Sequence, residues 1–132
     1  MRIVMVCPSY PPQDVVCGVG DYTKCLAEEL VRQGEQVVVV TSTGYRGDSG
    51  GAVTVLPLIS KWSAVEGWKL LRSRLDPPPD VIHMQYTPDL YGRLAGFVLL
   101  IGSIAPAASA LSMRAPGGPI KVLGAAIVGA AL

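Results

Sequence analysis

Apolar and polar residues alternate in blocks along the chain, and each block has the length of one secondary-structure element. Four short runs, residues 2–7, 36–41, 52–57 and 81–86, are rich in Val, Ile, Leu and Met. Unbroken apolar runs of this length are typical of strands that a parallel sheet buries on both faces. Two of the three stretches between them show helical periodicity, whereas residues 44–51 are polar and glycine-rich and are predicted to form an exposed loop. The pattern predicts an α/β fold with an open, doubly wound parallel sheet flanked by helices.

The first helix is predicted over residues 21–33, with one buried and one exposed stripe. The buried stripe is expected to hold Tyr22, Cys25, Leu26 and Leu30, and the exposed stripe Lys24, Glu28 and Arg32. Gly34 is expected to end this helix. A second helix is predicted from Ser63, whose spacing to Glu66 fits a capping box. In it Trp68, like the preceding Trp62, is interpreted as a core or interface residue.

The composition changes after Arg93. Residues 94–113 carry no charge and are rich in Ala and Gly, with Pro106 among them. Three interpretations stay open: a helix buried on the sheet, a hairpin inserted in a membrane, or a tail that is not native to this domain. The sequence favours the buried helix, followed by a fifth strand over residues 119–123. The chain is thus one domain, residues 1–132, in which residues 94–132 form an apolar tail.

A long connection, residues 9–20, joins the first strand to the first helix and contains Gly18 and Gly20. Free amide groups and the helix dipole at a helix start favour an anion such as a phosphate. An ordinary turn that needs two flexible residues explains the glycines equally well. The segment lacks the third glycine of the dinucleotide fingerprint and the Gly-Lys-Ser/Thr of a Walker A loop.

Charge and cysteine content exclude several classes of function. The net charge is +1 and the basic residues are scattered, so we expect no nucleic-acid partner. Three cysteines without Cys-x-x-Cys spacing and a single histidine, His83, offer no metal site. Cys7 and Cys25 are expected to act as small apolar residues. Free thiols favour a cytoplasmic setting, with peripheral membrane contact through the tail as an open alternative.

Three segments together resemble the N-terminal, Rossmann-like domain of retaining glycosyltransferases of family 4, which have the GT-B fold. These are the N-terminal strand with its Pro11-Pro12, the helical region with Cys-Gly-Val-Gly-Asp-Tyr-Thr at residues 17–23 and Leu-Ala-Glu-Glu-Leu-Val-Arg-Gln-Gly at residues 26–34, and Asp-Val-Ile-His-Met-Gln-Tyr at residues 80–86. The resemblance covers residues 1–93. It implies that this half of a two-domain enzyme holds the acceptor, while the other half binds a nucleotide-sugar, the co-substrate. No further cofactor and no metal are implied.

The resemblance also implies site residues. Gly18, Gly20, Asp21 and Tyr22 are candidates for contact with the diphosphate or the acceptor. His83, Gln85 and Tyr86 are expected to end a central strand, where ligands of open α/β sheets collect. His83 is the catalytic candidate, and a core histidine bonded to the backbone is the alternative.

The chain departs from the family pattern in ways that bear on activity. A donor-binding half has no room in 132 residues, and Leu-Gly-Ala-Ala, residues 123–126, stands where the family presents a histidine near the cleft. We therefore expect an inactive fragment of a hexosyltransferase-type enzyme, truncated or altered after residue 93, and leave open whether the chain itself is an enzyme. A non-catalytic Rossmann-like binding module is the alternative. A nicotinamide oxidoreductase ranks last, because Thr41, Ser42 and Thr43 replace the acidic residue that would hold the ribose.

Overall fold

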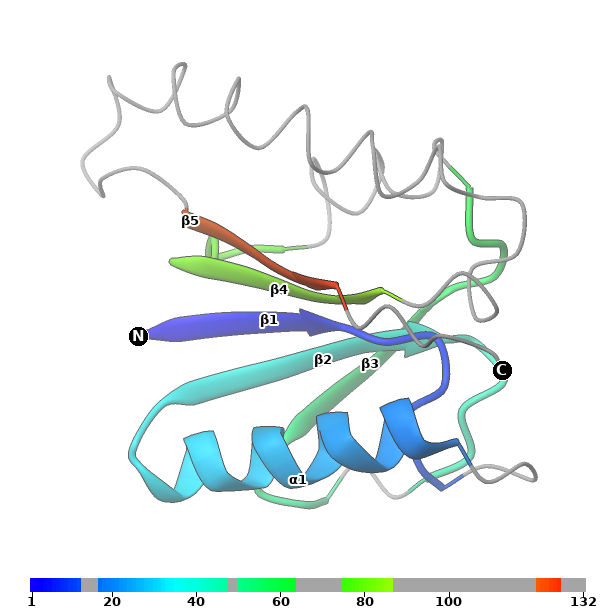
Figure 1. The fold of residues 1–132 in the computed structure, drawn as a ribbon, viewed down its shortest axis with the longest axis horizontal. Helices are drawn as coiled ribbons and strands as arrows, with labels where there is room; N and C mark the ends of the chain where they lie inside the picture. The colour runs from blue at the N-terminus through cyan, green and yellow to red at the C-terminus, as the bar shows by residue number, and fades with distance from the viewer. Residues whose placement is uncertain (13–16, 48–49, 64–74, 87–120, 127–132) are drawn as a thin grey trace.

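The computed structural model describes residues 1–12, 17–47, 50–63, 75–86 and 121–126. Within them one helix, α1 (Gly18–Arg32), lies against a sheet of five strands (Figure 1). The strands are β1 (Arg2–Val6), β2 (Gln36–Ser42), β3 (Thr54–Ile59), β4 (Val81–Tyr86) and β5 (Lys121–Ala126). All four pairings are parallel, in the order β3-β2-β1-β4-β5. The predicted Rossmann-like α/β fold is confirmed.

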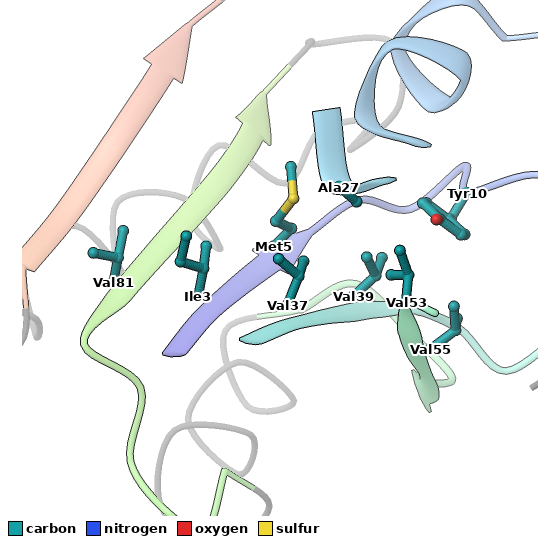
Figure 2. Close-up of a cluster of buried hydrophobic side chains, with 9 residues drawn as sticks. All are labelled: Ile3, Met5, Tyr10, Ala27, Val37, Val39, Val53, Val55 and Val81. Atoms are coloured by element: carbon teal, nitrogen blue, oxygen red, sulfur yellow. The ribbon is translucent and has the colours of Figure 1, made fainter. Parts of the chain in front are cut away.

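Both faces of the central strands are buried, which explains the unbroken apolar runs. On the face toward α1, Ile3, Met5, Val37, Val39 and Val81 pack with Ala27 of the helix (Figure 2). The opposite face is formed by alternate residues of the same strands: Val4, Val6, Val38, Val40, Ile82 and Met84. Trp62 packs against this second cluster, as predicted, whereas Trp68 lies outside the described residues.

Helix α1 begins at Gly18, three residues earlier than predicted, and buries a different stripe. Its buried residues are the small ones, Gly20, Thr23 and Ala27. Leu26 and Leu30 are partly buried, but Tyr22 and Cys25 are exposed, so their predicted burial was wrong. Small residues let the helix axis approach the sheet closely, and a search for large apolar residues overlooks such a face. The exposure of Lys24, Glu28 and Arg32 is confirmed.

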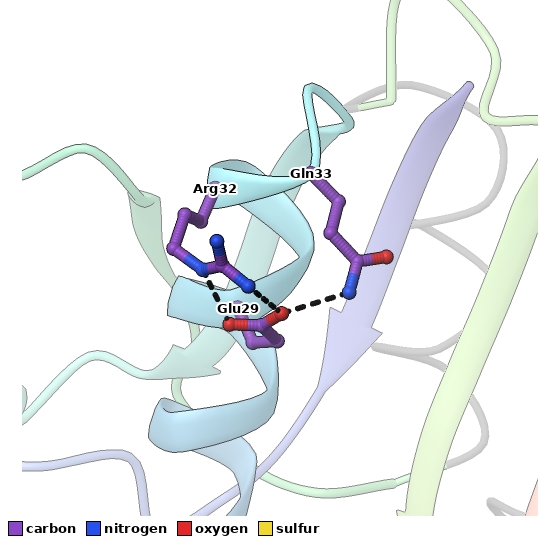
Figure 3. A network of polar contacts seen from close by, with 3 residues as sticks. All are labelled: Glu29, Arg32 and Gln33. Carbon is purple, nitrogen blue, oxygen red and sulfur yellow. Dashed lines mark hydrogen bonds and ion pairs between the residues drawn. The ribbon is translucent and has the colours of Figure 1, made fainter.

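The C-terminal end of α1 agrees with the prediction at Gly34. The Gly34 N–H donates to the Val31 carbonyl at 2.9 Å, and the Glu35 N–H donates to the Leu30 carbonyl at 3.0 Å. This Schellman pattern needs a left-handed residue, and Gly34 has a φ of +88°. In the last turn, Arg32 and Gln33 donate to the Glu29 carboxylate at 2.6 to 2.8 Å, which lowers the pKa of Glu29 (Figure 3).

The other predicted boundaries differ at the outer strands. The run at residues 52–57 predicted β3 two residues too early, because the strand continues through Pro57 to Ile59. A proline is tolerated there since β3 is the edge strand and the β2–β3 register shifts after Thr41. β5 overlaps the predicted strand at residues 119–123. Of the helix predicted from Ser63, residues 64–74 lie outside the described residues, as does the uncharged stretch 94–113.

Candidate functional site

The sheet reverses its direction of growth between β1 and β4. From β1 the chain passes through α1 to β2 on one side, whereas β4 and β5 lie on the other side (Figure 1). Connections that leave in opposite directions open a crevice at the carboxyl ends of such strands, and ligands of open α/β sheets bind there. The residues that follow β1 and those that end β4 therefore flank the candidate site, which we call the switch-point crevice.

The segment after β1 is tied to the end of β2 by side-chain hydroxyls. The Pro8 carbonyl accepts from Ser42 Oγ at 2.9 Å and from Thr41 Oγ1 at 3.4 Å. Trp62 Nε1 donates in turn to Ser42 Oγ at 2.9 Å. These two hydroxyls thus fix the path of the loop. They lie at the end of β2, where a nicotinamide oxidoreductase would carry the acidic residue that binds the ribose.

The two glycines at the start of α1 have different surroundings. A Cβ at Gly20 would lie 1.8 Å from the carbonyl oxygen of Ser9, so only glycine allows this close approach of loop and helix. A Cβ at Gly18 would meet nothing within 4 Å. One turn further, Thr23 donates to the Val19 carbonyl at 2.7 Å and lies 3.5 Å from Cys7 Sγ. Cys7 is buried, as predicted, and burial raises the pKa of its thiol.

The N-terminus of α1 carries no side-chain cap. Cys17 is the N-cap residue in an extended conformation, and its side chain makes no capping hydrogen bond. The first intrahelical bond runs from the Asp21 N–H to the Cys17 carbonyl at 3.0 Å. Asp21 is exposed in the first turn, and Tyr22 next to it is 51% exposed. This helix start thus combines backbone donors with one negative charge.

His83 and Gln85 lie on the same face of β4, two residues apart. His83 pairs with Met5 of β1 and Leu123 of β5, so its strand is a central one, as predicted, but His83 is the third of six residues and does not end the strand. It is half-buried, and burial lowers the pKa of its imidazole. Gln85 Nε2 and His83 Nε2 are 3.1 Å apart. With the amide as donor, His83 Nε2 is the acceptor and the neutral ring carries its proton on Nδ1.

Gln85 is the buried polar residue of the crevice that lacks a full set of partners. Its side chain is completely buried, and Oε1 has no hydrogen-bond partner in the described part of the chain. The last registered pair of the two strands is Val6 with Met84, so Gln85 is one residue beyond it, level with Cys7. An amide oxygen buried in this way costs free energy unless a ligand or water donates to it.

The fold brings the predicted site residues to one edge of the sheet, in two groups. Gly18, Gly20, Asp21 and Tyr22 belong to the first turns of α1, and Gln85 and Tyr86 end β4. Only the backbone of Tyr86 is described. The sequence did not predict that Ser42 and Trp62 hold the loop between these groups through their hydrogen bonds. The available signal was the pair of hydroxyl residues, Thr41 and Ser42, at the end of the second apolar run.

Two other features are missing from the described ranges. No cluster of three or more His, Cys, Asp or Glu side chains that could hold a metal ion occurs there. Among the same residues no helix is long and apolar enough to cross a membrane.

A family model described as a glycosyl transferase 4-like domain matches residues 17–121, well over half of the chain. No curated protein and no solved structure matches the chain. The matched stretch runs from the N-cap of α1 to the first residue of β5, so both groups of crevice residues lie within it.

Proposed function

This chain belongs to the family of glycosyl transferase 4-like domains, and from that premise we propose that it forms the acceptor-side half of a sugar-transferring enzyme. The switch-point crevice would hold the hydroxyl compound that receives the sugar. A nucleotide-sugar would be the donor, bound mainly by a second half that these 132 residues do not include. In this proposal the chain alone binds an acceptor but transfers no sugar, because it cannot close a cleft around the diphosphate.

The observation that carries the proposal is the unpartnered oxygen of Gln85. A carboxamide oxygen only accepts hydrogen bonds, so its natural partner is a hydroxyl or an N–H group and not a phosphate. A side chain that is fully buried and still lacks one partner is costly for stability alone, by about 1–3 kcal/mol. Since the Gln85 side chain has no exposed surface, an acceptor hydroxyl would reach Oε1 through a local shift of the residues that cover it, and its hydrogen bond would then remove this cost.

We assign His83 a positioning role. Its Nε2 lies 3.1 Å from the Gln85 amide nitrogen, so in the tautomer protonated on Nδ1 the lone pair that a catalytic base would use accepts a hydrogen bond from this amide. The lowered pKa keeps the ring neutral and therefore able to accept. His83 would thus orient Gln85 Oε1 toward the ligand and take no part in the chemistry.

The start of α1 would contact the ligand through its open positions. Gly18 leaves room for close approach to the backbone, and the uncapped amides of the first turn suit the donor's diphosphate. Asp21 and Tyr22 are exposed beside them and can accept from and donate to acceptor hydroxyls. Gly20 would not contact the ligand through a side chain. It would allow the loop to approach the helix, since the Ser9 carbonyl occupies the place where a Cβ would lie. The negative charge of Asp21 disfavours a phosphate bound at this turn alone.

A titration of the isotope-labelled chain tests the proposal. Methyl glycosides, myo-inositol, three nucleotide-sugars and a nicotinamide dinucleotide are added separately, and the Gln85 side-chain NH2 and the His83 ring signals are followed by NMR. We expect a hydroxylated acceptor to shift both signals, with no sugar transfer by the chain alone. If none of the hydroxyl compounds moves either signal, the acceptor-side assignment is wrong. A response to the dinucleotide alone would instead support a non-catalytic Rossmann-like binding module.

A further inference from the structure

A hollow, which we call the side groove, opens beside α1 and has a volume of about 550 Å³. Its described walls come from three segments: Tyr10 after β1, Lys24 and Glu28 on α1, and Tyr45 with Gly51 between β2 and β3. Val55 of β3 belongs to its lining too. None of the crevice residues of α1 or β4 is among these lining residues. The side groove is therefore a separate place on the domain.

The side groove exists because the crossover from β2 to β3 is short. Parallel strands are usually joined by a dozen or more residues that include a helix. Here residues 43–53 make the whole connection, and the described part of it is not helical. Helix α1 packs against β2 and, through Ala27, against residues of β1. Within the described residues, the same face of β3 is covered by this loop and by Tyr10. Tyr10, Val53 and Val55 lie together at that end of the apolar cluster (Figure 2).

The apolar part of the side groove is aromatic. The Tyr10 and Tyr45 rings are 6.1 Å apart and tilted by 49°. Tyr10 is 3% exposed, and burial raises its pKa to about 12, so it remains a neutral phenol at physiological pH. Tyr45 is half-buried in the loop above it. Ligand pockets of a few hundred Å³ commonly combine such aromatic surface with a few polar groups.

The polar part of the side groove is electrically balanced. Lys24 Nζ and Glu28 Oε1 are 4.0 Å apart, and their side chains are 46% and 56% exposed. The ammonium group supplies donors and the carboxylate supplies acceptors, while their opposite charges give no preference for an ion of either sign. A hydroxyl group both donates and accepts, so neighbouring hydroxyls of one ligand satisfy both side chains.

We propose that the side groove binds a neutral sugar residue, with its C–H surface against Tyr45, which packs on the buried Tyr10, and its hydroxyls on Lys24 and Glu28. Pro11 lines the side groove, and its Cδ would lie 3.3 Å from a Cβ on Gly20, so among the described residues the segment after β1 lies between this site and the start of α1. An acceptor made of several sugars would therefore occupy both places. That extension rests on the proposed function, whereas sugar binding in the side groove does not.

NMR titration of the 132-residue chain with methyl glucoside, methyl mannoside and methyl galactoside tests the inference. We expect at least one of them to shift the backbone amides of Tyr45, Gly51 and Lys24 at millimolar concentration. Tyr45→Ala should weaken this binding about fivefold, as expected for the loss of one aromatic contact. Tyr45→Phe keeps the ring and should retain it. Lys24→Met, an exposed change that leaves the core intact, should also weaken binding, whereas the matched Lys61→Met should not.

Two results would overturn the inference. One is that no glycoside shifts the amides around Tyr45; the other is that the shifts persist unchanged in both Tyr45→Ala and Lys24→Met. Gln85→Leu separates this inference from the proposed function, because it should abolish the response at β4 and leave the side groove unaffected. If Gln85→Leu alone removes the shifts around Tyr45, the side groove is not a site and the proposed function still stands.

Discussion

At the start of α1 a glycine is buried against a backbone carbonyl, whereas at the end of β4 a glutamine is buried with an amide oxygen that lacks a partner in the described chain. Both residues lie at the same edge of the sheet and both drew attention in the sequence. Packing accounts fully for Gly20, since any Cβ there would lie 1.8 Å from the Ser9 oxygen. Packing does not account for Gln85, because an apolar side chain of similar size would fill the same space. The unusual residue that packing leaves unexplained is the better guide to function.

The largest effect should come from breaking the packing side of this comparison. Gly20→Ala forces the loop and helix apart, and we expect it to lower the free energy of unfolding by about 2–3 kcal/mol. Gly18→Ala, two residues away with open space around it, should stay within about 0.5 kcal/mol of the parent chain. Urea denaturation of both variants measures the difference. Equal stability of the two variants would mean that the loop does not approach α1 as closely as described.

A smaller loss is expected where the loop is tied to β2. Ser42→Ala removes the donor to the Pro8 carbonyl and the acceptor of Trp62 Nε1, which should cost about 1–2 kcal/mol. Thr43→Ala, at the exposed next position, is the matched control and should be neutral within about 0.5 kcal/mol. The same denaturation experiment compares them. A neutral Ser42→Ala would show that the hydroxyl does not hold the loop.

The smallest effect concerns the neighbour of Gln85. Burial lowers the pKa of His83 in the folded chain below its ordinary value of 6.5. Below that pH the unfolded chain takes up a proton that the folded chain resists, so stability should fall as the pH drops from 6.5 toward the folded-state value. The slope is less than about 1.4 kcal/mol per pH unit, because one proton is involved and the ring is half-exposed. His83→Gln should flatten it.

Because the chain has a single histidine, its ring signals report this pKa directly in an NMR titration. A value at or above 6.5 would contradict the described burial of the ring and its role as a neutral acceptor for Gln85.

The sequence predicted most accurately the elements in which nearly every residue is buried. β1, β2 and β4 are buried on both faces, so their largely apolar runs gave their bounds to within one residue. The start of α1 was missed because its contact face is made of Gly20, Thr23 and Ala27, which carry almost no hydrophobic signal. The candidates on β4 were visible as two polar residues at alternate positions in an apolar run. The contact between Gln85 Nε2 and His83 Nε2, and the lack of a partner for Gln85 Oε1 in the described chain, depend on side-chain geometry and could not be predicted.

The side groove could not be predicted either, although its cause is visible in the chain. Residues 43–53 are too few for a helical crossover, and the loop contains Tyr45 among glycines and polar residues. Only the packing of α1 over β1 and β2 shows that a hollow results and that Lys24 and Glu28 line it.

The central claim is that Gln85 is buried for a ligand and not for stability. Gln85→Leu tests it most directly when stability and binding are measured on the same sample, by urea denaturation and by calorimetry with the hydroxyl compound that the NMR titration identifies. The account predicts that the free energy of unfolding stays within about 1 kcal/mol of the parent chain or rises, because an unpartnered buried oxygen is removed. It predicts also that binding weakens about tenfold, as for one lost hydrogen bond. A variant that loses stability by several kcal/mol and binds as before would contradict the claim.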